Sequence, residues 1–397
     1  MSPIPRLKTY LGPALLSYGF RPFFLAGTVY AGLGILIWVP LFVGELTLPT
    51  AFSPLDWHIH EMLYGYLPAI IAGFLLTAIP NWTGRLPLQG GPLAVLVAAW
   101  IAGRIAVCIS SIIGPLAAGA IDVSFLVLVV AATAREVIAG CNWRNLPPIC
   151  ILLIFAAGNA IFHIEDYETG HAEFGSRLGI AAAVALISWI GGRVVPSFTR
   201  NWLARENPGR LPVPFGRFDQ MVLSISVLAL AFWVASPAWL GTAALMLLAA
   251  AAQVTRLTRW AGDRTLRDRL VLILHIAYAF VPIGFAGLAA AALFPQIFPA
   301  SAGIHTWTVG AIGTMTLAIM TRASLGHTGQ ALIAGPLTQS IYAAIVIAAI
   351  LRIAAALLPG ATISLLYAAG TAWIAAFWVF AVGYGPLLSR TRRTLRQ

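Results

Sequence analysis

Long apolar stretches recur along almost the whole chain, and they constrain its fold more than any other feature. A helix needs about 20 apolar residues to cross a bilayer, where the backbone finds no hydrogen-bond partner in lipid. The stretches do not alternate in polarity, as the strands of a membrane barrel would. Only 9% of the 397 residues are charged, too few to cover a soluble domain, which carries roughly 25%. We therefore predict an all-α polytopic membrane protein with about twelve transmembrane helices, near 18–44, 57–80, 92–111, 113–134, 146–165, 173–196, 218–236, 238–256, 270–294, 301–325, 336–358 and 362–386.

The basic residues indicate how these helices are oriented. With the N-terminus inside, all of them except Arg104, Arg177 and Arg352 fall at one side of the membrane, including Arg6, Lys8 and Arg256. Positive residues accumulate in cytoplasmic loops, so both termini are predicted in the cytoplasm. The net charge of +11 then reflects topology, and the predicted partner is membrane lipid, with no nucleic acid.

We predict one integral membrane domain, 1–397, with no soluble domain. Helices 1–6 span about 18–196, an inner loop about 197–217, and helices 7–12 about 218–386. A faint repeat aligns His60-x4-Gly65 with His305-x4-Gly310, in the second and tenth helices. The segment 195–200, at the end of the sixth helix, resembles 79–84. A four-helix unit repeated three times is one interpretation, and a chance match is the other.

Histidines are the informative polar residues, because ionisable groups inside a membrane need a reason to be there. The topology sorts six of them into two layers. An outer layer holds His58, His60, His163 and His305 beside Glu61, and an inner layer holds His275 and His327. Any single one can be an interfacial or hydrogen-bonded core residue. Neutral imidazole also binds copper and haem iron, and helical bundles build such sites from facing helices, so the grouping favours a metal or haem site made by these six.

Helix geometry limits how two of these histidines can act. His58 and His60 are two residues apart, so on one regular helix they point about 200° away from each other. Either His58 precedes the helix, or the two serve different sites.

Arg104 and Asp122 are charged residues deep within the third and fourth predicted helices, at similar depth. Either alone would be an uncompensated buried charge, so we predict an ion pair between them. A proton path that uses Asp122 is the alternative.

Several motifs resemble those of one known family. They are Phe20–Leu25, Trp57-His58-Ile59-His60-Glu61-Met62 with Gly65, Gly73–Gly84, Gly191-Gly192-Arg193, Leu274-His275 with Tyr278, Met320–Ala323, and Leu325–Gly329. Together they resemble the NnrS family over nearly the whole chain. The resemblance implies a multi-pass protein of the bacterial cytoplasmic (inner) membrane that carries haem and copper. It also implies a role in the response to nitric oxide and protection from nitrosative stress.

The resemblance and the two layers together give a mechanism hypothesis. The inner His275 and His327 hold a haem b, and Arg21, Arg193 and Arg322 pair with its propionates. The outer layer, His163 included, holds copper or a second haem. Nitric oxide is reduced there with electrons from quinol, with His60 and Glu61 as the catalytic residues and Glu61 handling protons.

Two other classes of function stay open. A haem–copper sink or sensor would bind nitric oxide without turnover, and the sequence does not separate it from an enzyme. A metal transporter would need polar residues along one continuous track, whereas the middle of the predicted bundle is largely apolar.

Overall fold

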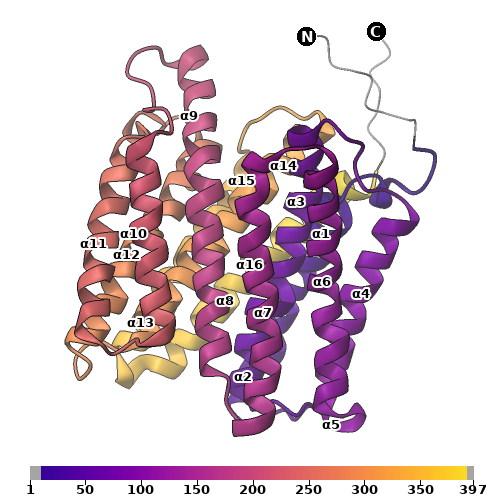
Figure 1. Ribbon diagram of the computed structural model, residues 1–397, viewed down its shortest axis with the longest axis vertical. Helices are drawn as coiled ribbons and strands as arrows, with labels where there is room; N and C mark the ends of the chain where they lie inside the picture. The colour runs from indigo at the N-terminus through magenta and orange to yellow at the C-terminus, as the bar shows by residue number, and fades with distance from the viewer. Residues whose placement is uncertain (1–9, 391–397) are drawn as a thin grey trace. The chain divides into compact units, whose positions relative to one another are not determined.

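A computed structural model describes residues 10–390 (Figure 1), so Arg6, Lys8, Arg392, Arg393 and Arg396 of the charge pattern lie outside the described residues. Every regular element in this range is helical. The α-helices are α1 (Phe20–Phe42), α2 (Pro54–His60), α3 (Leu67–Thr83), α4 (Gly91–Cys108), α5 (Ser110–Ile113), α6 (Pro115–Ala139), α7 (Leu146–Thr169), α8 (Glu173–Leu186), α9 (Gly192–Glu206), α10 (Arg217–Ala235), α11 (Leu240–Thr258), α12 (Arg269–Leu293), α13 (Ala300–His305), α14 (Thr314–Thr328), α15 (Pro336–Leu357) and α16 (Thr362–Ser389). Three π-helical segments are η2 (Glu61–Tyr66), η4 (Ile187–Gly191) and η6 (Thr306–Gly313), and four short 3₁₀ turns are η1 (Ala14–Leu16), η3 (Trp143–Asn145), η5 (Gly262–Arg264) and η7 (Pro359–Ala361).

Eleven helical runs within residues 10–390 are long and apolar enough to cross a membrane. The predicted tenth span, 301–325, is also helical, as α13, η6 and α14 in succession, but it is not among the eleven. Six threonines and Arg322 lie within this run. The prediction of an all-α polytopic membrane protein is confirmed, and the orientation of the termini stays a prediction.

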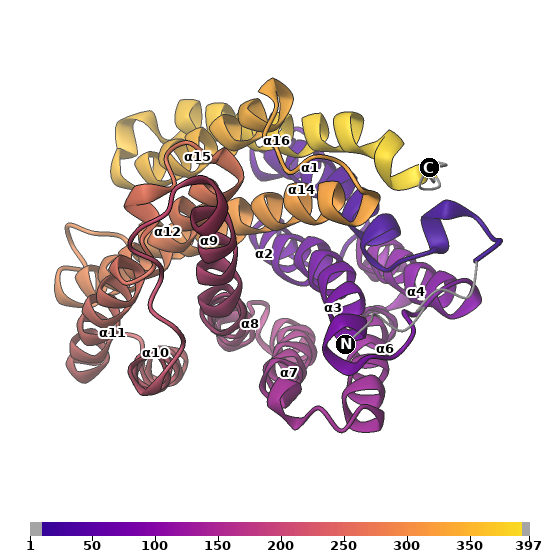
Figure 2. The same cartoon turned by 90° about the horizontal axis from the view of Figure 1, so that it is seen from above.

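The described residues divide into two compact units. Unit 1 comprises Met1–Gly179, Ala323–Ala331 and Phe380–Gln397, and unit 2 comprises Ile180–Arg322 and Leu332–Val379. In unit 1, α3 packs on α1. In the same unit α6 packs on both α4 and α7, which lie beside it in the end-on view (Figure 2). In unit 2, α11 packs between α10 and α12, and α13 packs on α12 and α15. The division falls within the helical run Glu173–Glu206, which continues ten residues beyond the predicted end of the sixth helix.

The three π-helical segments lie in the three helices that carry the predicted repeat. His60 directly precedes η2, and His305 directly precedes η6. A π-helical turn accommodates an extra residue and is found disproportionately at functional sites. The segments therefore single out these helices as places where side chains leave the regular helical register.

Local sequence sets where α2 begins. Ser53 accepts a hydrogen bond from the backbone N–H of Asp56, and Pro54 occupies the first helical turn, where its missing N–H costs nothing. The helix α2 ends at His60, because the π-helical segment η2 begins at the next residue, Glu61. His60 thus stands where the α-helix passes into the π-helical segment.

Candidate metal centre

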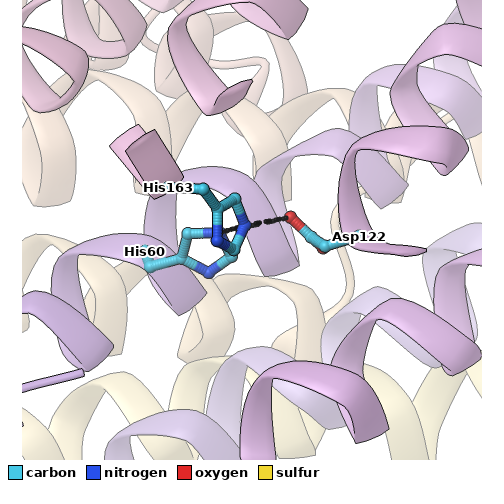
Figure 3. A group of neighbouring side chains, drawn as sticks. All are labelled: His60, Asp122 and His163. Atoms are coloured by element: carbon cyan, nitrogen blue, oxygen red, sulfur yellow. Dashed lines mark hydrogen bonds and ion pairs between the residues drawn. The ribbon is translucent and has the colours of Figure 1, made fainter. Parts of the chain in front are cut away.

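Three side chains from three helices of unit 1 converge on one point (Figure 3). They are His60 at the end of α2, Asp122 on α6 and His163 on α7. The Nε2 atoms of the two histidines are 3.1 Å apart, and each lies 3.2 Å from Oδ2 of Asp122. All three residues are buried. The structure thus brings together two of the four histidines of the predicted outer layer, His60 and His163, and it adds Asp122 to them.

These separations suit a shared cation. Two ligand atoms about 2.0–2.1 Å from one ion at a tetrahedral angle are about 3.3 Å apart. The donor set of two imidazoles and one carboxylate binds several first-row transition metals. The three groups therefore fit a small metal ion without rearrangement of the helices.

Polar groups flank both ring nitrogens of His60. Its Nδ1 lies 2.8 Å from the acceptor Oε1 of Glu61, and a proton on Nδ1 leaves Nε2 available as a metal ligand. That Nε2 is also 3.0 Å from the amide oxygen of Asn159, while the Asn159 amide nitrogen donates to Oδ2 of Asp122 at 2.7 Å. A carboxylate that accepts the second N–H of a ligating histidine fixes its tautomer, as in many metal sites.

Arg104 on α4 holds the two carboxylates of the cluster. One of its nitrogens donates to both oxygens of Glu61 at 2.6 Å, and the other is hydrogen-bonded to Oδ1 of Asp122. The hydroxyl of Tyr30 also donates to Glu61. The predicted Arg104–Asp122 ion pair is confirmed, and Glu61 proves to be a second partner of the same guanidinium.

Aromatic rings enclose the centre, and glycines let the helices approach. The ring of Phe52 lies 5.1 Å from that of His60 and 5.4 Å from that of His163, and the ring of Phe162 lies 5.2 Å from that of His60. A Cβ on Gly119 would lie 3.0 Å from Cγ of His163, so α6 and α7 meet closely because this residue has no side chain. The centre is therefore a dry, tightly packed site.

The family of the chain follows from a comparison with known families. Residues 14–392 match the family described as NnrS protein. The chain belongs to the NnrS family. No curated protein matches it. Membership in NnrS supports a role in the nitric oxide response and an association with haem and copper.

Copper fits the His60 centre of this NnrS chain. Imidazole nitrogen suits copper, the Nε2 atoms of His60 and His163 lie close together, and Asp122 adds an anionic donor. Sequence reasoning missed Asp122 as a candidate ligand because it assigned this residue to an ion pair with Arg104 or to a proton path. Asn159 was missed too, although it lies one helical turn before His163 on α7.

The other two histidines of the predicted outer layer lie elsewhere. His58 stacks on Trp38 with ring centroids 3.8 Å apart, so His58 and His60 serve different surroundings, as their spacing on one helix indicated. His305 belongs to unit 2, where its Nδ1 donates to the backbone oxygen of Ser301 at 2.6 Å. Their roles as metal ligands stay predictions.

The two histidines of the predicted inner layer fall in different units. His275 is buried in unit 2, and its Nε2 lies 2.8 Å from the hydroxyl of Thr199, which itself donates to the oxygen of Val195. The other ring nitrogen of His275, Nδ1, is buried without a hydrogen-bond partner among the described residues. His327 belongs to unit 1 and lies beside Phe20, with centroids 5.4 Å apart. A shared haem between them stays a prediction.

Haem fits this NnrS chain only in part. His275 offers an unpartnered buried nitrogen, which suits an axial ligand. However, a Cβ on Gly262 would lie 2.5 Å from that same Nδ1, so backbone already covers this edge of the ring.

The three arginines predicted to bind propionates make different contacts. Arg21 donates to the backbone oxygens of Leu388 at 2.8 Å and Arg390 at 2.7 Å, and so satisfies carbonyls at the end of α16. Arg193 lies over the ring of Trp189 at 4.5 Å. Arg322 lies over the ring of Phe198 at 4.1 Å, and its Nη1 is buried with no hydrogen-bond partner among the described residues. Nε of Arg21 is likewise buried without a hydrogen-bond partner among the described residues, so Arg21 and Arg322 each keep a donor that an anionic group would satisfy.

One arginine of the charge pattern has a different environment from the one expected. Arg256 was assigned to the cytoplasmic surface, but it is fully buried at the end of α11. Its Nε donates to Asp219 in the first turn of α10 at 2.9 Å, and its Nη1 donates to the oxygen of Ser188 at 2.9 Å. The burial of Arg256 is thus explained by an ion pair that sequence analysis missed.

Proposed function

We propose that this NnrS chain captures nitric oxide at a metal held by His60, Asp122 and His163, and reduces it with electrons from quinol. The observation that carries the proposal is the convergence of these three buried side chains within 3.2 Å of one another. The proposed setting is the bacterial inner membrane, and the proposed benefit is protection from nitrosative stress.

The surroundings of the centre suit a small uncharged substrate. Nitric oxide dissolves in the apolar interior of a membrane, and aromatic rings from Phe52 and Phe162 surround the imidazoles. Copper, when bound, would supply an electron-rich ion that binds nitric oxide. Asp122, His60 and His163 would hold it, and Glu61 would orient His60 through its Nδ1.

Reduction of nitric oxide to nitrous oxide also needs protons, since 2 NO + 2 e⁻ + 2 H⁺ gives N₂O + H₂O. The hydroxyl of Tyr30, the carboxylate of Glu61 and the ring of His60 form one hydrogen-bonded series that ends at the centre. This series supports the predicted proton role of Glu61. His275, which belongs to the same unit as Arg322, stays in the proposal as the residue that would hold a haem, and that haem would supply electrons.

The test uses the purified full-length protein with a reduced quinol analogue and nitric oxide. We expect metal content of about one ion per chain at the centre, and nitrous oxide produced over many turnovers. His60→Ala should abolish both, whereas His171→Ala, at an exposed histidine, should change neither. Uptake of one nitric oxide per chain without turnover would show that the protein binds nitric oxide as a sink and does not reduce it. Full activity in His60→Ala would refute the site.

A further inference from the structure

We infer that Arg104 sets the net charge of the His60–Asp122–His163 centre to minus one, and thereby selects cuprous copper over divalent ions. This inference rests on the proposed function, because it assumes that a metal binds at the centre. It assigns to Arg104 a role beyond that of an ion-pair partner.

The charge count follows from the bonded groups. Glu61 and Asp122 each bring one negative charge, and both are hydrogen-bonded to Arg104, which brings one positive charge. His60 and His163 are neutral when their nitrogens act as ligands. Asn159 and Tyr30 add no charge. The groups bonded to one another at the centre therefore sum to minus one.

Because the centre is buried, its net charge of minus one strongly affects which cation it binds. The side chains of His60 and Glu61 are 0% exposed, that of Asp122 is 2% exposed, and that of Arg104 is 7% exposed. Charge interactions in such a medium are several times stronger than in water, and an uncompensated charge there is costly. A monovalent cation brings the centre to neutrality, whereas a divalent ion leaves it positive by one charge.

The ligand types alone do not determine whether the centre prefers cuprous copper or a divalent ion. Imidazole accepts copper, zinc and iron alike, and a carboxylate is a harder donor that favours higher charge. If Arg104 were absent, the same ligands would sit in a centre of charge minus two, which suits a divalent ion. The guanidinium is therefore the feature that favours the cuprous state.

A purely structural role for Arg104 is the competing explanation, because this residue also ties α4 to η2 and α6. The two explanations differ in how a second substitution acts. Glu61→Gln keeps an acceptor for His60 and brings the charge to zero, and Arg104→Gln brings it to minus two. The double variant Glu61→Gln/Arg104→Gln returns the charge to minus one without the guanidinium.

The experiment measures the midpoint potential of copper in the copper-loaded full-length protein, by redox titration followed through the Cu(II) electron paramagnetic resonance signal. Added negative charge stabilises Cu(II), so Arg104→Gln should lower the ratio of Cu(I) to Cu(II) affinity at least tenfold, which is 59 mV for a one-electron couple. Glu61→Gln should raise the ratio at least tenfold. The double variant should return to within threefold of the natural protein.

The outcomes separate the inference from the proposed function. Equal potentials in all four proteins, or a double variant that stays shifted, would overturn the charge role of Arg104 while leaving the metal site intact. If Arg104→Gln does not fold, Glu61→Gln and the double variant still supply both tests. A natural protein that binds no copper, or a His163→Ala variant that retains it, would instead refute the metal site itself.

Discussion

Each unit contains one buried cluster built around an arginine, and the two clusters differ in their balance of charge. In unit 1, Arg104 faces two carboxylates, beside two histidines whose Nε2 atoms converge. In unit 2, Arg256 faces one carboxylate, Asp219, and the remaining partners are neutral. The first cluster is short of positive charge, and the second is balanced.

The hydrogen bonds of the second cluster also lead away from any common point. Arg256 donates to the hydroxyl of Tyr278 at 3.0 Å, Tyr278 donates to Gln253 at 2.8 Å, and Gln253 donates to Ser226 at 2.9 Å. Ser226 then donates to a backbone oxygen of its own helix. A balanced cluster whose hydrogen-bond chain ends on a backbone oxygen cross-links helices. A cluster with surplus negative charge and converging imidazole nitrogens can also bind a cation.

The largest expected effect is a loss of stability when the balanced cluster around Arg256 is broken. Arg256→Gln leaves Asp219 buried without its counter-charge, and removing one member of a buried pair costs about 3–5 kcal/mol. Thermal unfolding in detergent should show this loss with metal content unchanged. Arg210→Gln, in the exposed pair with Asp263, should unfold almost like the natural protein. Equal stability of Arg256→Gln and Arg210→Gln would contradict the cross-linking role.

The next largest effect is expected in metal affinity, when the unbalanced cluster around Arg104 loses its anionic ligand Asp122. Asp122→Asn should weaken metal binding about a hundredfold, at the upper end of the 10–100-fold loss typical of residues that only orient ligands. Competition with a chelator measures the dissociation constant. Asp219→Asn makes the same chemical change in the other cluster and should leave the constant unaltered. A similar affinity in the two variants would mean that Asp122 is not a ligand.

A smaller change is expected at the amide that orients the centre. Asn159→Leu removes the donor to Asp122 and the oxygen near His60, so metal affinity should fall about tenfold. Gln253→Leu, the corresponding loss of a buried amide in unit 2, should lower stability without affecting metal. The same chelator competition and detergent unfolding apply, and unchanged affinity in Asn159→Leu would restrict the site to its three ligands.

The smallest effect concerns a single hydrogen bond outside both clusters. Thr199→Val removes the partner of His275, at a cost of about 1 kcal/mol. Thr133→Val is the control, because the Thr133 hydroxyl contacts only carbonyls of its own helix. If His275 ligates haem, the absorbance of the haem should shift in Thr199→Val and stay constant in Thr133→Val. Identical unfolding temperatures for the two variants would show that the bond contributes nothing.

The sequence predicted the features that depend on one helix at a time. Apolar length predicted the spans, and depth along the helices brought Arg104 to Asp122. The spacing of His58 and His60 predicted their divergence. These properties follow from helix geometry, which sequence position determines directly.

Apart from the Arg104–Asp122 pair, which similar depth indicated, the contacts of the site that depend on which helices are neighbours were not predicted. Asp122 meets His163 only because α6 packs on α7, and Glu61 meets Arg104 only because α4 packs beside η2. Arg256 seemed to belong to a loop because it lies at the end of an apolar run. Its partner Asp219 lies in the first turn of the preceding helix, so the pairing of antiparallel neighbours α10 and α11 was the signal available.

The position of Phe52 has a consequence for exchange at the centre. Its ring contacts both imidazole-bearing sides of the site, and its loop is tied down where Ala51 donates to the hydroxyl of Ser110 at 2.8 Å. A hydrated cation has to shed its water to reach His60 beneath this ring. We therefore expect metal to exchange slowly at the centre once it is bound.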